Sequence, residues 1–177
     1  YTAESVMFPH QLNLAATFNT NLAKTVGEIT TYELRASAIP WNYAPVLDVA
    51  RHARWGRIFE SFGEDTYVTS EMGRAMILGM QGEKSQRTLN SIACAKHFIG
   101  YGASYNGKDR SPVFLPDNYI KQVLLPPFKE AIDNGLLSIM ISSGSLNGVP
   151  SHADYNLITK TLKEELGFEG FVISDWS

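Results

Sequence analysis

Short apolar runs alternate with helix-forming segments along this chain of 177 residues, and that alternation is the strongest constraint on its fold. The runs lie at residues 39–47, 92–98, 137–141 and 171–173, and each is short enough for a strand. Strands that are apolar on both faces and separated by helices indicate a parallel sheet. The sequence therefore predicts an α/β fold of parallel helix-strand units. Periodicity alone leaves an open sheet and part of a barrel as alternatives.

Residues that cap helices stand where the helical patterns begin and end. Asn19, Asp65 and Asp154 each precede a segment with apolar residues at helical spacing, and their side chains suit an N-cap. Gly82 and Gly167 follow two of these segments, and glycine commonly ends a helix because it tolerates a positive φ. These signals predict three of the four expected helices.

The remaining helix is expected after Asp117, and it contains a proline pair, Pro126–Pro127. Proline removes a backbone donor from a helix interior but is favoured in a first turn. The sequence therefore predicts a break at the pair and a restart at Phe128. Prolines also occur within the run 39–47, which favours an irregular or edge position for that strand.

Composition and charge exclude several classes of partner. The chain has 15 Lys and Arg against 18 Asp and Glu, a net charge of −3, and no basic stripe that would neutralise phosphates. No apolar run approaches the roughly 18 residues that span a bilayer. We therefore expect no nucleic-acid partner and no membrane span. The four histidines are scattered without metal-ligand spacing, so no metal and no cofactor are expected.

Polar residues follow the apolar runs, at the strand ends where functional groups of β/α proteins gather. After the last run, Asp175 precedes Trp176, and a carboxylate beside an indole suits a carbohydrate site. The alternative for Asp175 is a cap for the next helix. Lys96 and His97 end the second run, and both could hold hydroxyls if a bulge turns them to one side. Their alternative is a surface lysine and a satisfied core histidine.

A loop rich in cationic, aromatic and acidic side chains spans residues 51–65. Such a loop suits a polar ligand, and its alternative is a solvated loop with local ion pairs. The glycines at 100 and 102 lack a full dinucleotide-binding pattern, and the serines at 142, 143 and 145 show no nucleophile-elbow pattern.

Taken together, these segments resemble glycoside hydrolase family three, the β-glucosidase family. The matching pieces run in the family's order over nearly the whole chain, and the ordered set is far more specific than any one piece. They are Phe8–Pro9, Ala15–Asn19, Ala44–Asp48, Arg54–Arg57, Glu60–Asp65, Ala95–Phe98, Leu125–Phe128, Asn147–Pro150 and Gly167–Trp176. The resemblance implies a portion of a (β/α)8 barrel of the TIM type, with about four helix-strand units, since a whole barrel takes roughly 250 residues.

The resemblance also implies roles for single residues. Asp175 matches the catalytic nucleophile, which forms a covalent glycosyl-enzyme in a retaining mechanism. The residues expected to bind substrate are Arg57, Lys96, His97, Met140, Trp176 and Arg110. The first three match residues that hold hydroxyls of the non-reducing-end sugar, and the cations would keep Asp175 ionised. Ser143 stands where many members have a tyrosine.

The general acid of this mechanism is expected outside the chain. Retaining hydrolysis needs a second carboxyl roughly 5 Å from the nucleophile. The N-acetylglucosaminidase branch of the family supplies its acid from an Asp-Ser-His element after Lys-His-Phe, but residues 99–110 contain no histidine. The resemblance therefore favours the β-glucosidase branch, in which a glutamate of a second, α/β sandwich domain is the acid.

On this interpretation residues 1–177 are a fragment of the N-terminal barrel domain, without the second domain. The chain's abrupt end after the run 171–173 raises the same expectation. The substrate would be a β-linked oligosaccharide or glucoside, cleaved at a terminal non-reducing β-D-glucosyl or related residue. The remainder of the same polypeptide is the expected partner, and the fragment alone is expected to be inactive. The family suggests a secreted, periplasmic or lysosome-like location.

Two other classes of function remain open at this point. One is a non-catalytic carbohydrate-binding relative, against which the combination of Asp175 with Lys96 and His97 argues. The other is an unrelated β/α-barrel enzyme, such as a phosphate-binding barrel. That function needs a glycine-rich phosphate loop at a helix N-terminus, and the sequence offers no convincing one.

Overall fold

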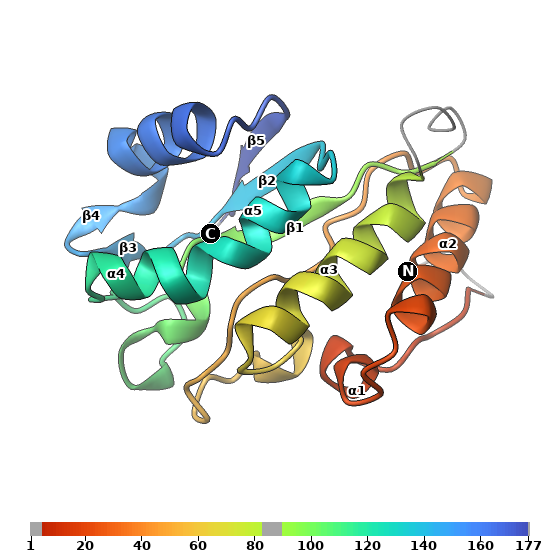
Figure 1. Cartoon of the computed structure of the whole chain (residues 1–177), viewed down its shortest axis with the longest axis horizontal. Coiled ribbons are helices and arrows are strands. Elements are labelled where there is room, and N and C mark those ends of the chain that lie inside the picture. The colour runs from red at the N-terminus through yellow and green to blue at the C-terminus, as the bar shows by residue number, and fades with distance from the viewer. Residues whose placement is uncertain (1–4, 83–89, 177) are drawn as a thin grey trace.

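The protein is described by a computed structural model that covers residues 5–82 and 90–176, and its centre is a parallel sheet. Strands β1 (Cys94–Phe98), β2 (Ser138–Ile141) and β5 (Phe171–Ser174) lie side by side in chain order, and both pairings are parallel. Figure 1 shows α3 and α5 covering one face of this sheet, with α2 beyond α3. The predicted parallel α/β fold is confirmed.

A fourth, irregular strand lies beside β1. Trp41 pairs with Ile92 and Val46 with Lys96, both in parallel, and backbone hydrogen bonds join the two segments between these bridges. The pairing is interrupted because Pro45 has no N–H to donate. The irregular edge strand expected for residues 39–47 is confirmed, so four successive parallel strands form one portion of a (β/α)8 barrel.

Helices and short turns connect these strands. The longer helices are α2 (Thr20–Ala36), α3 (Thr66–Gln81), α5 (Leu125–Asp133) and the π-helix η7 (Asn156–Glu165). The shorter ones are α1 (Gln11–Ala15), η1 (Ile58–Glu60), η3 (Tyr101–Ala103), η4 (Tyr105–Gly107), α4 (Asp117–Tyr119), the π-helix η5 (Ile120–Leu124) and η6 (Ser151–Ala153). A hairpin of β3 (Ser145–Leu146) and β4 (Val149–Pro150) follows β2. Across the described ranges, every helix falls short of the length and hydropathy that a membrane crossing requires.

The predicted helix caps are confirmed. The Asn19 side chain accepts a hydrogen bond from the N–H of Leu22 at 3.1 Å, and Asp65 accepts from Val68 at 2.8 Å. The Asp154 Oδ1 accepts from the backbone N–H groups at the start of η7, at 2.9 and 3.1 Å. Gly167 adopts the positive φ expected of a residue that ends a helix.

The predicted break at Pro126–Pro127 is wrong. The prolines occupy the first turn of α5, as their preference suggests, but α4 and η5 run into α5 without an interruption. The missing N–H of Pro127 leaves the carbonyl of Val123 without its usual helical donor. The Thr66 hydroxyl donates to that carbonyl at 3.1 Å, so a side chain of α3 compensates and the helix continues.

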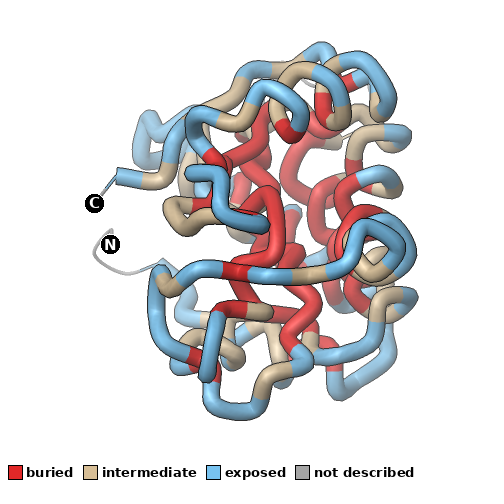
Figure 2. Tube along the Cα trace, turned by 90° about the vertical axis from the view of Figure 1, so that its left-hand side faces the viewer, coloured by how far each residue is buried: buried red, intermediate tan, exposed pale blue. Residues whose placement is uncertain are grey.

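The core lies between the sheet and its helices. Figure 2 shows the buried parts of the trace gathered inside, with exposed outer turns around them. Every residue of β2 is buried, whereas in β5 Phe171 is 44% exposed and Ser174 is exposed as well. In the described residues β5 has a strand on one side only, at the opposite end of the sheet from residues 41–47.

Two glycines let α2 and α3 pack backbone to backbone. A Cβ added at Gly27 would lie 2.5 Å from the carbonyl oxygen of Met76, and one at Gly79 would lie 2.1 Å from that of Lys24. Both distances are far below van der Waals contact, and the neighbouring atoms belong to the backbone. Any side chain at either position therefore forces the helices apart.

We expect Gly79→Ala to lower the free energy of unfolding by about 1–3 kcal/mol, because overpacking outweighs the roughly 1 kcal/mol that alanine gains in helix propensity. Urea denaturation followed by circular dichroism measures the change. Gly56→Ala is the matched control, since no atom lies within 4 Å of its added Cβ. We expect the control to stay within about 0.5 kcal/mol of the parent. An equally small effect of Gly79→Ala would contradict the close packing.

Candidate active site

The carboxyl ends of the strands bring together four of the residues predicted from the sequence. Arg57 follows the first strand through a loop, Lys96 and His97 lie in β1, and Asp175 directly follows β5. The Lys96 amine is within electrostatic reach of Arg57 and Asp175, and of a carboxylate not predicted, Glu60. The register of β1 against β2 shifts between Ala95 and Phe98, which is the irregularity that the prediction required.

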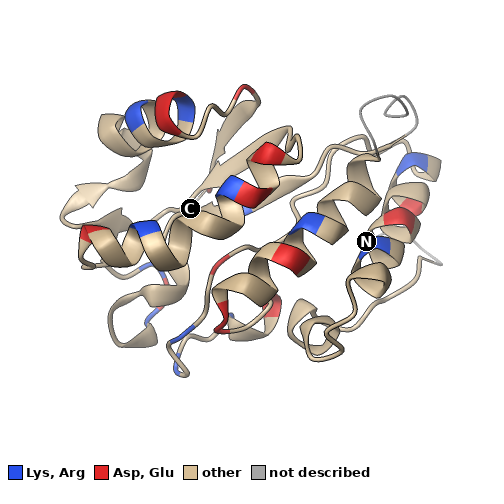
Figure 3. Ribbon diagram, in the orientation of Figure 1, with Lys and Arg blue, Asp and Glu red and all other residues tan. Residues whose placement is uncertain are grey.

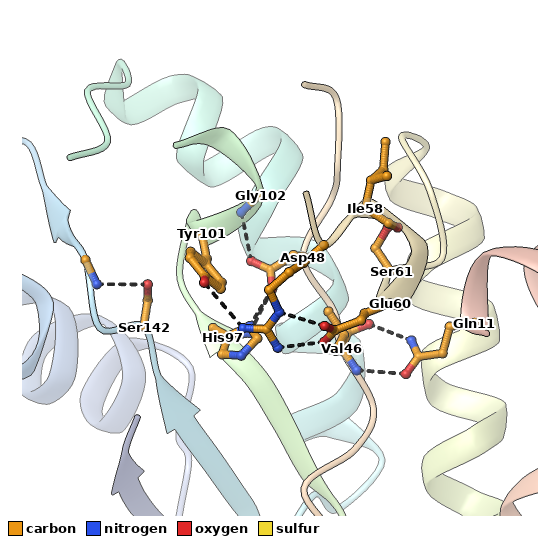
Figure 4. Close-up of polar contacts among 12 residues, drawn as sticks. Gln11, Val46, Asp48, Ile58, Glu60, Ser61, His97, Tyr101, Gly102 and Ser142 are labelled. Carbon is orange, nitrogen blue, oxygen red and sulfur yellow. Dashed lines mark hydrogen bonds and ion pairs between the residues drawn. The ribbon is translucent and has the colours of Figure 1, made fainter. Parts of the chain in front are cut away.

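His97 is buried, and it is held by a carboxylate from the neighbouring strand end. Asp48 Oδ2 lies 2.9 Å from the ring nitrogen Nδ1 of His97 and accepts from the His97 backbone N–H at 3.0 Å. Asp48 Oδ1 accepts from the backbone N–H of Gly102 at 3.3 Å. Figure 4 shows this carboxylate between His97 and Gly102. The alternative prediction, a buried histidine with its hydrogen bonds satisfied, therefore holds for the Nδ1 atom of His97.

Arg57 is fixed in a two-pronged pair with Glu60. Its Nε donates to one carboxylate oxygen at 2.7 Å and its Nη2 to the other at 2.6 Å. Its third donor, Nη1, lies 3.3 Å from the Tyr101 hydroxyl, and the guanidinium stands 5.3 Å from that ring's centre. The hydrogen bond to Glu60 raises the pKa of Arg57. Burial acts to raise the pKa of Glu60, but Arg57 outweighs it and the pKa is lowered.

Tyr101 links this pair to the loop that follows β1. Its hydroxyl donates to the Asp109 carboxylate and accepts from Arg57, and its ring packs edge-on against His97, with 4.8 Å between the ring centres. Burial, followed by the neighbouring Asp109, raises the pKa of Tyr101. The phenol is therefore a neutral bridge between Asp109 and Arg57 at physiological pH.

Lys96 is half-buried among charges of both signs. Burial is the main reason that its pKa is lowered, and the neighbouring Arg57 acts in the same direction. Glu60 and Asp175 act in the opposite direction. Its alternative reading as a surface lysine is therefore wrong. An ammonium group in this setting has donors to offer a ligand.

One carboxylate oxygen of Asp175 has no hydrogen-bond partner in the described part of the chain. Its backbone N–H donates to the carbonyl of Ile141 at 3.2 Å, which fixes the residue to the end of β2. Its Oδ2 is buried and makes no hydrogen bond to any residue in 5–82 or 90–176. Buried polar atoms are nearly always paired, so an unpaired one at a strand end is a candidate for ligand contact. A cap for a following helix would involve residues beyond the described ranges.

The other predicted binding residues, Trp176, Arg110 and Met140, differ in their contacts and in their burial. Trp176 is 57% exposed and packs on Tyr43, with 5.2 Å between the ring centres. Arg110 Nη2 donates to the carbonyl of Trp176 at 3.3 Å, so the loop after β1 reaches the end of β5. Met140 is buried in β2 on the face opposite to Ile139 and Ile141, whose side chains join the helix-covered core.

Four polar residues of the site were missed by the sequence prediction: Asp48, Glu60, Tyr101 and Asp109. Asp48 could have been found, because it follows an apolar run in the same way as Asp175 does. Glu60 lies in the loop 51–65 that suits a polar ligand, three residues from its partner Arg57. Tyr101 carries no such signal, since its contact with Arg57 is set by how two loops meet. Ser143, at the position of the family's tyrosine, has a buried Oγ without a hydrogen-bond partner in the described residues.

Cys94 is not a competing nucleophile. It is fully buried in β1, and burial raises the pKa of its thiol to about 11. The reactive form of cysteine is the thiolate, which is scarce at neutral pH when the pKa is that high. Within the described ranges, no group of three or more histidine, cysteine or acidic side chains is arranged to hold a metal.

The outer surface has a different character from this site. A groove of about 290 Å³ contains none of the predicted site residues; it is lined by Asp117, Ile120, Lys121, Leu125, Leu146, Asn147, Val149, Asp154, Asn156, Leu157, Thr161 and Glu165. Figure 3 shows basic and acidic residues interspersed along the helices.

Comparison with known proteins gives consistent matches. The sequence model of the glycosyl hydrolase family 3 N-terminal domain matches residues 2–177. The chain is 42% identical over 182 residues to a lysosomal beta glucosidase from Dictyostelium discoideum, covering 99% of this chain and 22% of that protein. A crystal structure of exo-1,3/1,4-beta-glucanase from a Pseudoalteromonas species matches with a TM-score of 0.94 and 38% identity, covering 97% of this chain and 22% of that one. A mutant beta-glucosidase from Listeria innocua in complex with laminaribiose matches with a TM-score of 0.95 and 32% identity, covering 98% and 24%.

Proposed function

Because the chain belongs to glycosyl hydrolase family 3, we propose that it carries the nucleophile half of the active site of a retaining β-glycosidase. Residues 1–177 are then part of that enzyme's N-terminal barrel domain, and the activity belongs to a longer polypeptide. The chain spans 22% of the length of the Dictyostelium relative, which agrees with this division. The family membership argues against an unrelated phosphate-binding barrel.

The observation that carries the proposal is the unpaired oxygen of Asp175 beside the cation Lys96. In the first step a carboxylate oxygen of Asp175 attacks the anomeric carbon while the bond from that carbon to the leaving oxygen breaks. A general acid gives its proton to the leaving oxygen. In the second step the same residue takes a proton from water, the water oxygen attacks the anomeric carbon, and the ester to Asp175 breaks.

The sugar is held by groups that donate hydrogen bonds. Lys96 and Arg57 have only donors, and they offer these to hydroxyl oxygens of the non-reducing-end sugar. Glu60 keeps Arg57 in one orientation through its two hydrogen bonds. Such contacts accelerate the reaction only where they are stronger in the distorted, oxocarbenium-like transition state than in the bound substrate.

The general acid is supplied by a part of the polypeptide outside the described residues. Glu60 is a candidate for the acid, because Glu60 and Asp175 both lie within electrostatic reach of Lys96. Both of its oxygens accept from Arg57 and its pKa is lowered, so it stays ionised and has no proton to give. A glutamate of a second domain is the source that the family resemblance suggests.

The substrate is a β-linked glucoside or a related β-glycoside. Support comes from the names of the relatives, which are a beta glucosidase and an exo-1,3/1,4-beta-glucanase, and from the laminaribiose bound to the Listeria protein. Trp176, with more than half of its surface exposed next to Asp175, offers a flat face for the sugar that occupies the site.

The decisive experiment follows the anomeric configuration of the first sugar released from an aryl β-glucoside by the full-length protein. Proton NMR recorded within minutes is expected to show the β-anomer before mutarotation, because two displacements at one carbon retain configuration. The isolated chain of 177 residues is expected to give no turnover, since the proposal assigns the acid to another part of the polypeptide. Release of the α-anomer, or robust hydrolysis by the isolated chain, would contradict the proposal.

A further inference from the structure

Asp48 has no task in the mechanism above, although it is buried at the centre of the site. It is 3% exposed and lies at the end of the first strand, against His97 on β1. Taking a carboxylate out of water costs free energy unless hydrogen bonds replace its hydration. Three groups of the surrounding chain replace that hydration here.

All three groups around Asp48 present hydrogen. Two are the backbone N–H groups of His97 and Gly102, which can only donate. The third is the ring nitrogen Nδ1 of His97, 2.9 Å from Oδ2. Since the carboxylate accepts from its other neighbours and offers no hydrogen in return, Nδ1 must carry the proton. Asp48 thereby selects one tautomer of the imidazole.

The selection determines what His97 offers on its other side. In a neutral ring with its proton on Nδ1, Nε2 is a hydrogen-bond acceptor. Within residues 5–82 and 90–176 no group is hydrogen-bonded to Nε2. The neighbouring Arg57 and Lys96 can only donate, and the oxygens of Glu60 are taken by Arg57. A sugar hydroxyl needs an acceptor as well as donors, and Nε2 can supply it.

We propose that Asp48 is a positioning residue that holds His97 as the Nδ1–H tautomer, so that Nε2 accepts a hydrogen bond from a hydroxyl of the non-reducing-end sugar. This inference rests on the proposed glycosidase function for its substrate, but the tautomer itself does not depend on catalysis. Asp48 makes no contact with substrate and acts through His97. Lys96 then supplies donors and His97 an acceptor to hydroxyl groups of the sugar.

The tautomer can be measured directly in the full-length protein. In protein labelled with ¹⁵N-histidine, the imidazole of His97 is expected to show a protonated Nδ1 and an unprotonated Nε2 at neutral pH. His97→Gln identifies the resonances by their loss. A protonated Nε2 with a bare Nδ1, or a doubly protonated ring, overturns the proposal without any kinetic measurement. Inactive protein would refute the glycosidase function and leave this readout intact.

The variant Asp48→Asn tests whether the tautomer matters for the reaction. The two carboxylate oxygens accept from three donors, and an amide has only one oxygen, so whichever way the amide turns at least one donor meets an N–H. The hold on the Nδ1 proton is weakened, and a ring that moves this proton to Nε2 turns its acceptor into a donor. We expect kcat/KM for an aryl β-glucoside to fall about 10- to 100-fold, the range for a misplaced buried hydrogen bond. Asp65→Asn is the matched control, because asparagine also caps helix α3, and it is expected to retain parental kinetics.

A double-mutant cycle separates positioning from a general loss of structure. If Asp48 acts through His97, the variant with both Asp48→Asn and His97→Ala is expected to be no slower than His97→Ala alone. Fully additive losses would show that Asp48 supports the fold and not the histidine. An Asp48→Asn enzyme within threefold of the parent would also overturn the proposal. Should that variant fail to fold, the wild-type tautomer still decides.

Discussion

Replacing Asp175 with alanine in the full-length protein is expected to lower kcat by about four orders of magnitude or more. In the proposed mechanism this carboxylate forms the first bond to the anomeric carbon, and within residues 5–82 and 90–176 its Oδ2 has no hydrogen bond that would hold it away from a substrate. Glu60, the carboxylate near Lys96, is not free to replace it, since both of its oxygens are bound by Arg57. Steady-state hydrolysis of an aryl β-glucoside measures the loss.

Sodium azide gives this prediction a sharper form. A small anion that enters the space left by Asp175→Ala attacks the anomeric carbon from the same side as the carboxylate. The expected product is the α-glycosyl azide, which NMR distinguishes from the β-anomer. Asp154→Asn, a carboxyl-to-amide change at the cap of η7, is the control and should keep parental activity. An Asp175→Ala enzyme with substantial activity and no azide product would show that another group is the nucleophile.

Replacing Lys96 with methionine is expected to lower kcat/KM about 100-fold, because the charged donor that the proposed mechanism assigns to a sugar hydroxyl is lost from a half-buried site. Methionine keeps the length of the side chain and removes the charge. Burial penalises that charge, so the variant is expected to be at least as stable as the parent. Lys163→Met is the matched control, since Lys163 bonds to a backbone carbonyl outside the site.

The pH profile of kcat/KM identifies Lys96 independently. The lysine must be protonated to donate, and burial lowers its pKa below the ordinary value of 10.5. Activity that depends on it is therefore lost as pH rises through this lowered value, before an exposed lysine would lose its proton. We expect the parental enzyme to have this alkaline limb and the residual activity of Lys96→Met to lack it. If the alkaline limb is the same in the Lys96→Met variant, the limb belongs to the titration of another group.

The parts of the fold that local chemistry determines could be predicted from the sequence. Asn19, Asp65 and Asp154 cap helices as expected, because an N-cap needs only its own side chain and backbone donors within three residues. The strands could be predicted from short runs of apolar residues. The proline pair was misjudged because its compensation comes from Thr66 in another helix, which no local pattern reveals.

The site was predictable to a lesser degree. Asp175, Lys96 and His97 stand at the ends of apolar runs, where β/α proteins carry functional groups, and the family resemblance adds Arg57. The partners from distant segments that fix these side chains were not predictable. Asp48 and His97 are 49 residues apart, and Arg57 and Tyr101 are 44 apart, so their contacts depend on how strands and loops assemble.

The parallel order of the strands affects how the chain folds. Each pairing in the sheet joins segments separated by a whole helix, and Arg110 meets Trp176 across 66 residues of chain. Closing such long loops reduces chain entropy before the contacts compensate, which makes non-local pairings slow to form. Helices with their own caps can form early in folding. A chain folded only that far would contain the candidate site residues described above and still lack their geometry.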